Sequence, residues 1–240
     1  MTRTSIALLS VVLALAATAA GAQDIPVAPP QPDPGGVNGT LPAEDIATPP
    51  GLPAIGKWMI DRNGVIAHWL DETVRGKRLR EPINVIVVDA AAAGADEAKR
   101  RLVAAAKKAG YPVRFGHSTG YRGFIGNQLY AQLPAGRDDA FSNDVFEVSN
   151  NHGRLFGPYK MNGVYVFIGA FSREEVRPYR RPAHRYASFN RARDDFSQRL
   201  DRKTSFKLSG FVKLDNAIVG DAAVTTGDHD GLAVLLRAGR

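Results

Sequence analysis

A run of β-branched residues at 83–88 constrains the fold of this chain more than any other part of its sequence. Five of its six residues are Ile or Val, and the run ends at Asp89. A short segment that is apolar on both faces is typical of a strand buried in the middle of a sheet. Residues 96–109 are predicted to form a helix. They begin with two acidic residues, carry a stripe of Ala and Leu on one face and have two lysines near their end, and Gly110 follows as a helix stop. Val113–Phe115 completes a predicted strand–helix–strand unit.

The rest of the chain predicts further strands and two more helices. Asn63 is a good N-cap, and Ile66, Trp69 and Leu70 share one helical face, so a helix is expected over residues 64–75. Residues 190–200 have apolar side chains four apart, which predicts a second helix. Strands are expected where β-prone residues concentrate or alternate with polar ones: 128–133, 145–149, 155–156, 164–171, 206–212 and 232–236. Residues 155–156 and 164–171 are expected to pair as a hairpin across Gly157-Pro158 and Asn162-Gly163.

These elements predict a fold of the α/β or α+β class. We expect a single domain over residues 57–240, with a mixed β-sheet of about five to seven strands and helices packed on at least one face. The loop after the 83–88 strand contains neither G-x-G-x-x-G nor G-K-[ST], which argues against a nucleotide site there.

The first 22 residues have the organisation of a cleavable secretory signal peptide. Arg3 supplies a positive charge, residues 6–17 are apolar, and Ala20-Gly21-Ala22 forms an A-x-A cleavage site. The alternatives are a buried N-terminal helix and a retained anchor. The apolar stretch is shorter than a membrane span, and no later segment is long enough for one. We therefore expect a periplasmic or secreted protein, cleaved after Ala22, with no transmembrane segment after cleavage.

Residues 23–56 are expected to form a Pro/Gly-rich, disordered linker, because they hold nine of the fifteen prolines. The chain has no Cys, which excludes disulfides and thiolate metal sites and, with export, favours a bacterial periplasm. Lys and Arg outnumber Asp and Glu by 31 to 24, so the formal net charge of +7 favours anionic partners. Nucleic acid is not expected, because no basic–aromatic motif accompanies the charge.

Four polar groups are candidates for chemistry. His152 and Arg154 are two residues apart and project to the same face if they lie on a strand. The other groups are His184, the Arg193-Asp194-Asp195 triplet, and His117 with Tyr121-Arg122. Single histidines are more often packed or surface residues than ligands, and we interpret His68, His117 and His229 in that way. Asp228-His229-Asp230-Gly231 is typical of a polar turn.

Taken in order along the chain, these segments resemble the LssY C-terminal domain family over roughly residues 83–236. The resemblance is carried by His152-Gly153-Arg154-Leu155-Phe156, residues 163–170, His184 and Asn190-Arg191-Ala192-Arg193-Asp194. Upstream, residues 84–88, Ala109-Gly110-Tyr111, and residues 128–131 followed by Arg137-Asp138 match the family's opening strand, helix end, and middle strand with its turn.

The resemblance implies a fold and a site cluster, which consists of His152, Arg154, His184, Arg193 and Asp194. It implies no reaction, because the family has no settled biochemical activity. Acidic positions of the family pattern are replaced here by Ala187, Asn190 and Ala192, so any chemistry that those acids perform in the family is absent from this chain.

The sequence leaves three functions open. The first is an exported accessory or ligand-binding domain that binds an anionic envelope component through Arg154 and Arg193. The second is a periplasmic phosphoester-type hydrolase with His152 and His184 as acid or base, Arg154 and Arg193 stabilising negative charge, and Asp194 or Asp195 orienting a histidine. The third is a purely structural domain. A metal site made of His152, His184 and Asp194 is possible in principle, but their spacing in the sequence does not argue for it, and neither a metal nor a cofactor is expected. No serine-nucleophile or zinc-protease motif is present, so the catalytic residues and protein partners stay unknown.

Overall fold

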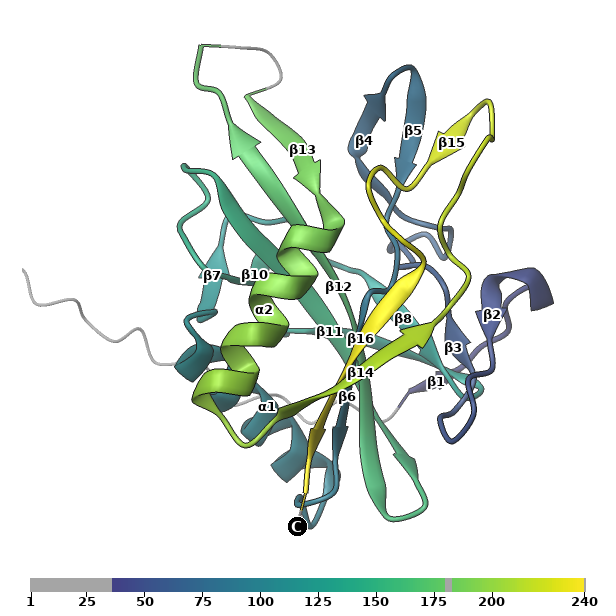
Figure 1. Ribbon diagram of the computed structural model, residues 1–240, viewed down its shortest axis with the longest axis vertical. Coiled ribbons are helices and arrows are strands. Elements are labelled where there is room, and N and C mark those ends of the chain that lie inside the picture. The colour runs from purple at the N-terminus through teal and green to yellow at the C-terminus, as the bar shows by residue number, and fades with distance from the viewer. Residues whose placement is uncertain (1–35, 180–182, 240) are drawn as a thin grey trace, which may run out of the picture.

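The computed structural model describes residues 36–179 and 183–239, which form a sheet-rich domain with two α-helices (Figure 1). The expected signal peptide at 1–22, its cleavage site after Ala22 and residues 23–35 of the expected linker lie outside the described residues. Within the described part, no helix has the length and apolar character that a membrane crossing requires.

The chain forms short strands first, then α1, a group of longer strands, α2 and a closing strand. The elements are β1 (Val37–Asn38), η1 (Ala43–Asp45), β2 (Ile46–Ala47), β3 (Ile55–Gly56), β4 (His68–Val74), β5 (Lys77–Arg80), β6 (Val85–Asp89), α1 (Ala95–Ala109), β7 (Val113–Phe115), β8 (Arg122–Ile125), β9 (Gln128–Leu133), β10 (Asp139–Ser142), β11 (Asn150–Met161), β12 (Val164–Val176), β13 (His184–Ser188), α2 (Phe189–Lys203), β14 (Lys207–Lys213), β15 (Val224–Thr225) and β16 (Leu232–Ala238).

The main sheet has the strand order β14-β16-β6-β12-β11-β9-β8-β3-β2. Strands β16 and β6 are parallel, and the other pairs along this path are antiparallel, so the sheet is mixed as predicted. A smaller sheet, β15-β5-β4, lies beside it. The strands outnumber the expected five to seven, because many are only two to four residues long and carry too few residues to show an alternating pattern.

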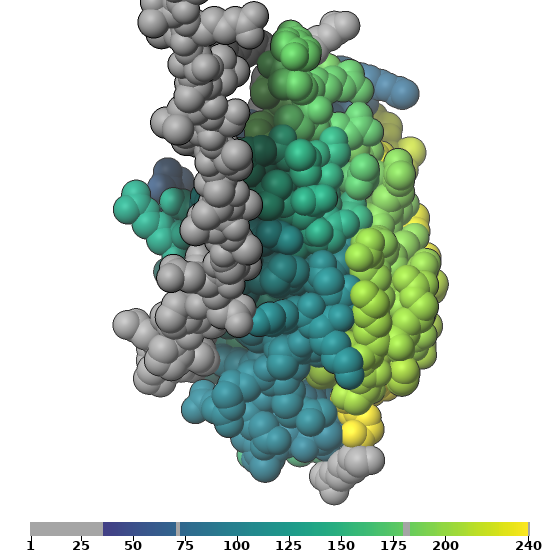
Figure 2. Space-filling view, turned by 90° about the vertical axis from the view of Figure 1, so that its left-hand side faces the viewer, coloured from purple at the N-terminus to yellow at the C-terminus, as the bar shows by residue number. Residues whose placement is uncertain are grey.

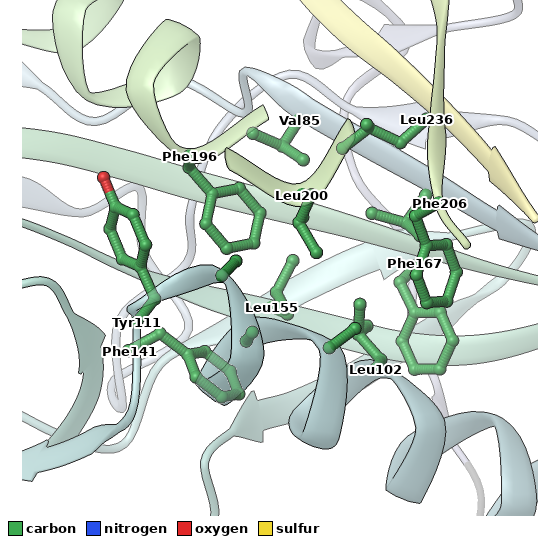
Figure 3. Packing of buried hydrophobic residues seen from close by; sticks show 14 of the residues in the cluster. Val85, Leu102, Tyr111, Phe141, Leu155, Phe167, Phe196, Leu200, Phe206 and Leu236 are labelled. Carbon is green, nitrogen blue, oxygen red and sulfur yellow. The ribbon is translucent and has the colours of Figure 1, made fainter. Parts of the chain in front are cut away.

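Strand β6 is buried on both faces, which confirms the prediction of a central strand. Val85 and Val87 pack in the core beneath the helices, whereas Ile86 and Val88 pack in a second core on the opposite face of the sheet. Figure 3 shows Val85 among the helix residues of the first core, labelled there as Leu102, Phe196 and Leu200.

Both helices lie on the same face of the sheet (Figure 1). Helix α1 ends as predicted at Gly110, which adopts the left-handed conformation with φ 89°. Helix α2 confirms the helix expected at 190–200, and the Oγ of Ser188 accepts a hydrogen bond from the backbone N–H of Arg191 at 2.9 Å as an N-cap. Figure 2 shows the blue surface around α1 beside the yellow-green surface of α2 and β14, far apart in sequence.

The two strands that flank α1, β6 and β7, do not pair with each other as parallel neighbours. Strand β7 pairs with β10, whereas the parallel neighbour of β6 is the C-terminal strand β16. The hairpin of β11 and β12 is confirmed, and its two-residue turn is Asn162-Gly163, with φ 49° and 78° as a type I′ turn requires. Gly157-Pro158 lies inside β11, where the pairing register with β12 shifts between Phe156 and Tyr159.

The helix predicted over residues 64–75 is wrong, because most of this segment is strand β4, paired antiparallel with β5. Trp69 is buried and the adjacent Leu70 is exposed, so the two residues face opposite sides rather than one helical face. Asn63 caps no helix. It belongs to a turn in which the Asp61 carboxylate accepts hydrogen bonds from the backbone N–H groups of Asn63 and Val65.

Two further expectations are corrected. The linker cannot extend to residue 56, because Val37 pairs with Leu129 of β9 and Ile55 is fully buried, so the domain begins before residue 57. Several prolines of the segment, such as Pro42 and Pro49, lie outside the strands, where no ladder hydrogen bond is needed. Residues 145–149 form a loop rather than a strand.

Candidate functional site

A pocket of about 630 Å³ lies between the smaller sheet and the β11–β12–β13 region of the main sheet, within the size range of small-molecule sites. Two of the strands that contribute lining residues, β4 and β13, lie near the top of the molecule in Figure 1. Its lining combines three histidines, two carboxyl groups, two arginines and several aromatic rings: Trp69, Leu70, Thr73, Glu81, Gly116, His117, Ser118, Tyr121, Phe146, His152, Arg154, Glu174, Ala183, His184 and Arg185.

Three of the five predicted site residues line this pocket. His152 and Arg154 lie on β11 and His184 on β13, as expected for residues that converge. Arg193 and Asp194 lie elsewhere, on α2. The Arg193 guanidinium binds the Asp230 carboxylate at 2.7 and 3.1 Å and the carbonyl of Leu232 at 2.9 Å, so it joins α2 to the start of β16.

Asn150 orients both His152 and Glu174. Its amide nitrogen donates to a Glu174 oxygen at 2.6 Å and to the carbonyl of Val148 at 3.0 Å, and a carbonyl only accepts. Its amide oxygen must therefore face His152, where it accepts from Nδ1 at 3.0 Å. This assigns the proton of His152 to Nδ1 and leaves a lone pair on Nε2.

The Nε2 atom of His152 lies 3.3 Å from the Oγ of Ser172. That hydroxyl accepts a hydrogen bond from the indole N–H of Trp69 at 3.1 Å, so its own proton is available to His152. Burial, with the nearby charges of His117 and Arg154, holds the pKa of His152 well below its usual range. His152 is therefore a neutral imidazole whose acceptor nitrogen lies beside Ser172 of β12.

His117 enters the pocket from the loop after β7. Gly116 precedes it with φ 96°, and a Cβ at that position would lie 2.9 Å from the Cβ of Phe146, so only glycine fits this close approach. The ring of His117 lies 4.5 Å from that of His152 and is 5 % exposed, and its Nε2 has no hydrogen-bond partner among the described residues. Burial, followed by repulsion from Arg154, lowers its pKa to about 4.

Glu174 lies between Asn150 and His184. One of its oxygens accepts from Asn150, and the other lies 3.4 Å from Nδ1 of His184. The ring of His184 stacks on Phe146 at 4.1 Å, in the loop that the sequence indicated as a strand. Burial raises the pKa of Glu174, against the opposing effect of its hydrogen bonds.

Arg154 is a buried cation that lines the same pocket and is 3 % exposed. Its guanidinium donates to the carbonyl of Ser118 at 2.6 Å and lies 4.7 Å from the centre of the Tyr121 ring, a cation–π contact. Its Nε has no partner within residues 36–179 and 183–239. The nearby Glu81 is also buried, which raises its pKa to about 7 although Arg154 lowers it.

The ligand atoms of His117, His152 and Glu174 all lie within 4.8 Å of one another. Two imidazoles and one carboxylate can hold a divalent metal ion. The metal set considered from the sequence was His152, His184 and Asp194. The group in the structure contains His117 and Glu174 in place of His184 and Asp194.

Sequence reasoning missed three pocket residues and dismissed a fourth. His117 was interpreted as an isolated packed histidine, and Glu81, Glu174 and Phe146 were not singled out. For Glu174 the signal is incomplete, because the hairpin turn at Asn162-Gly163 brings the end of the second strand opposite residues 150–154 but does not determine which face Glu174 lies on. For Glu81 and His117 no local pattern exists, because they reach the pocket from separate loops and strands.

No family model matches this sequence, and searches of curated proteins and of solved structures found no significant match. The residues and geometry of the pocket are therefore the basis for the functional argument.

Proposed function

We propose that this chain is an exported periplasmic accessory domain, of the LssY C-terminal type, that binds an anionic small molecule or envelope component in the pocket around Arg154. One observation carries this proposal: a permanently charged guanidinium is 3 % exposed inside a pocket of about 630 Å³ and has an Nε without a partner among the described residues. Buried charges are normally paired and hydrogen-bonded. A phosphate or carboxylate would supply the missing partner through charge-assisted hydrogen bonds.

The surrounding charges support an anion in this place. The nearby Glu81 has a pKa raised by burial to about 7, so its negative charge compensates Arg154 only in part near neutral pH. Burial also raises the pKa of Glu174. The positive net charge of the chain also favours an anionic partner. Export is supported by the signal-type N-terminal segment, and N-terminal sequencing of protein from the periplasm is expected to begin at Gln23.

Titration with inorganic phosphate by isothermal calorimetry, on chelator-treated protein at low salt, tests the anion site. Saturable binding to the wild type is expected, with weakening at higher ionic strength. Arg154→Met should abolish it, and Arg154→Lys should retain part, because an ammonium keeps the charge without the planar fork. Arg137→Met removes the same charge at a side chain that is 94 % exposed and should bind normally. Equal binding by wild type and Arg154→Met would refute the proposal.

One arrangement favours phosphoester hydrolysis as a second candidate. Asn150 orients His152, and Nε2 of His152 contacts the hydroxyl of Ser172, which is the order of an orienting group, a base and a nucleophile. We rank it second because Ser172 is 3 % exposed and does not line the pocket, so a substrate has no access to its hydroxyl. Arg193, which the hydrolase hypothesis required, also lies away from the pocket. Turnover of p-nitrophenyl phosphate that is lost in Ser172→Ala would reverse this ranking.

A further inference from the structure

Three donor groups meet inside the pocket on parts of the chain that are distant in sequence. His117 comes from the loop after β7, His152 from β11 and Glu174 from β12. All three are buried, and their ligand atoms lie within 4.8 Å of one another. We propose that these residues form a binding site for one divalent transition-metal ion, with Zn²⁺ as the preferred occupant. Two imidazoles and a carboxylate suit Zn²⁺, and three protein ligands leave a coordination position open toward the pocket.

The spacing of the three groups requires only small side-chain movements. Ligand atoms bound to Zn²⁺ at about 2.0–2.1 Å in a tetrahedral site lie roughly 3.4 Å apart. The atoms here are separated by at most 4.8 Å, so they would have to approach one another by no more than about 1.4 Å.

The Nε2 atom of His117 is the independent observation that indicates a ligand. It is buried in a residue that is 5 % exposed, and it has no hydrogen-bond partner among the described residues. An unpaired buried polar atom costs free energy, so such atoms are rare in folded proteins. A metal ion bound at this nitrogen would remove that cost.

The second coordination shell is already in place. Asn150 accepts from Nδ1 of His152 and donates to Glu174, so one side chain orients two of the ligands. The tautomer that this assigns to His152 leaves Nε2 with the lone pair a metal needs. Its contact with the Ser172 hydroxyl, at 3.3 Å, is long for a hydrogen bond and is readily exchanged for a metal. His184 flanks the second oxygen of Glu174.

The inference deepens the proposed function, because a metal ion would place a second positive charge in the pocket that holds Arg154. Only the link between the metal and an anionic ligand rests on the proposed function. Metal binding is therefore titrated in the absence of phosphate. Failure of metal binding would leave the phosphate result of the chelator-treated protein intact, and failure of phosphate binding would leave the metal result intact.

The test is calorimetric titration of the chelator-treated chain with ZnCl₂. We expect one saturable equivalent of Zn²⁺, and X-ray absorption at the zinc edge should show imidazole ligands. His117→Ala and the isosteric Glu174→Gln should each lower the affinity at least about tenfold, whereas His68→Gln, a half-buried histidine outside the pocket, should stay within about twofold of the wild type.

Near-UV circular dichroism of each variant shows whether the fold is retained, and Glu174→Gln keeps the result decisive if His117→Ala fails to fold. Wild-type protein that takes up no Zn²⁺ would overturn the inference. Several weak equivalents that persist in folded Glu174→Gln, or that fall equally in His68→Gln, would assign the binding to scattered surface groups and overturn it as well.

Discussion

Asn150 and His152 lie two residues apart on one face of β11 and are joined by a hydrogen bond of 3.0 Å between Oδ1 and Nδ1. The same amide donates to Glu174 on the neighbouring strand, so a single side chain holds two chemically active groups in a fixed relation. The pocket is therefore preorganised by β11 and β12, whereas His117 and Phe146 reach it from loops.

Replacement of Asn150 by Leu should destabilise the protein by at least about 2 kcal/mol. The change leaves His152, Glu174 and the carbonyl of Val148 without their shared partner, and each unsatisfied buried group costs about 1–3 kcal/mol. Urea unfolding of the variant and the wild type measures this difference. Asn63→Ala, in an exposed turn, should change stability by less than about 0.5 kcal/mol. Equal stability of Asn150→Leu and wild type would show that the network does not hold the pocket.

Replacement of Arg193 by Met should lower stability without affecting the pocket. Its hydrogen bonds to Asp230 and Leu232 link α2 to the start of β16, and another joins it to the adjacent Asp194. Charged hydrogen bonds contribute about 1.5–3 kcal/mol each before screening. Both carboxylates are partly exposed, so we expect a total loss of about 2–3 kcal/mol. Denaturant unfolding and phosphate titration are measured together. Loss of phosphate binding at unchanged stability would show instead that Arg193 takes part in anion binding.

Anion binding should strengthen as the pH falls from about 8 to 6. Burial raises the pKa of Glu81 to about 7, and protonation there removes a negative charge that faces Arg154 and the Tyr121 hydroxyl. The affinity for sulfate, whose own charge is constant in this range, should rise roughly three- to tenfold in the wild type. Glu81→Gln should bind at pH 8 about as tightly as the wild type does at pH 6. A parallel pH dependence in the two proteins would exclude Glu81 as the cause.

His229 should make the fold sensitive to mild acid. Burial lowers its pKa to about 4, and Asp228 and Asp230 oppose this effect while Arg193 adds to it. The imidazole of His229 binds a proton near pH 6.5 in the unfolded chain and only near pH 4 in the folded chain. The contribution of His229 to the free energy of unfolding is therefore full above pH 6.5 and is lost as the pH falls toward 4. The shift corresponds to about 3 kcal/mol.

Comparison of the wild type with His229→Gln isolates this contribution. In the wild type, Nε2 of His229 forms a hydrogen bond of 2.8 Å with the amide oxygen of Asn216, and the side-chain amide of glutamine is the closest replacement for this donor. The other buried histidines titrate equally in both proteins. The free energy of unfolding should therefore fall by about 3 kcal/mol less in the variant between pH 6.5 and 4. Parallel stability curves would rule out His229 as the acid-sensitive group.

Local pattern predicted the elements whose periodicity is long or unambiguous. Strand β6, helices α1 and α2, and the turn at Asn162-Gly163 all follow from residue spacing and turn chemistry. Residues 64–75 were assigned to the wrong element because the spacing of Ile66, Trp69 and Leu70 fits a helix, while pairing with β5 stabilises a strand there. Strands of two residues carry no period, so the N-terminal part of the domain was not recognised.

The sequence by itself determined the class of fold, the central strand, the shared strand face of His152 and Arg154, and the hairpin that follows them. Only the tertiary structure decided which side chains face His152. A regular hairpin from Met161 and Val164 would place Arg173 opposite His152, but the extra residue of β11 near Gly157-Pro158 places Ser172 there and brings Glu174 to the same face. A shift of one residue moves every side chain to the other face of a strand, and no local pattern specifies it. His117 and Glu81 reach the pocket by long-range packing, which depends on the whole fold.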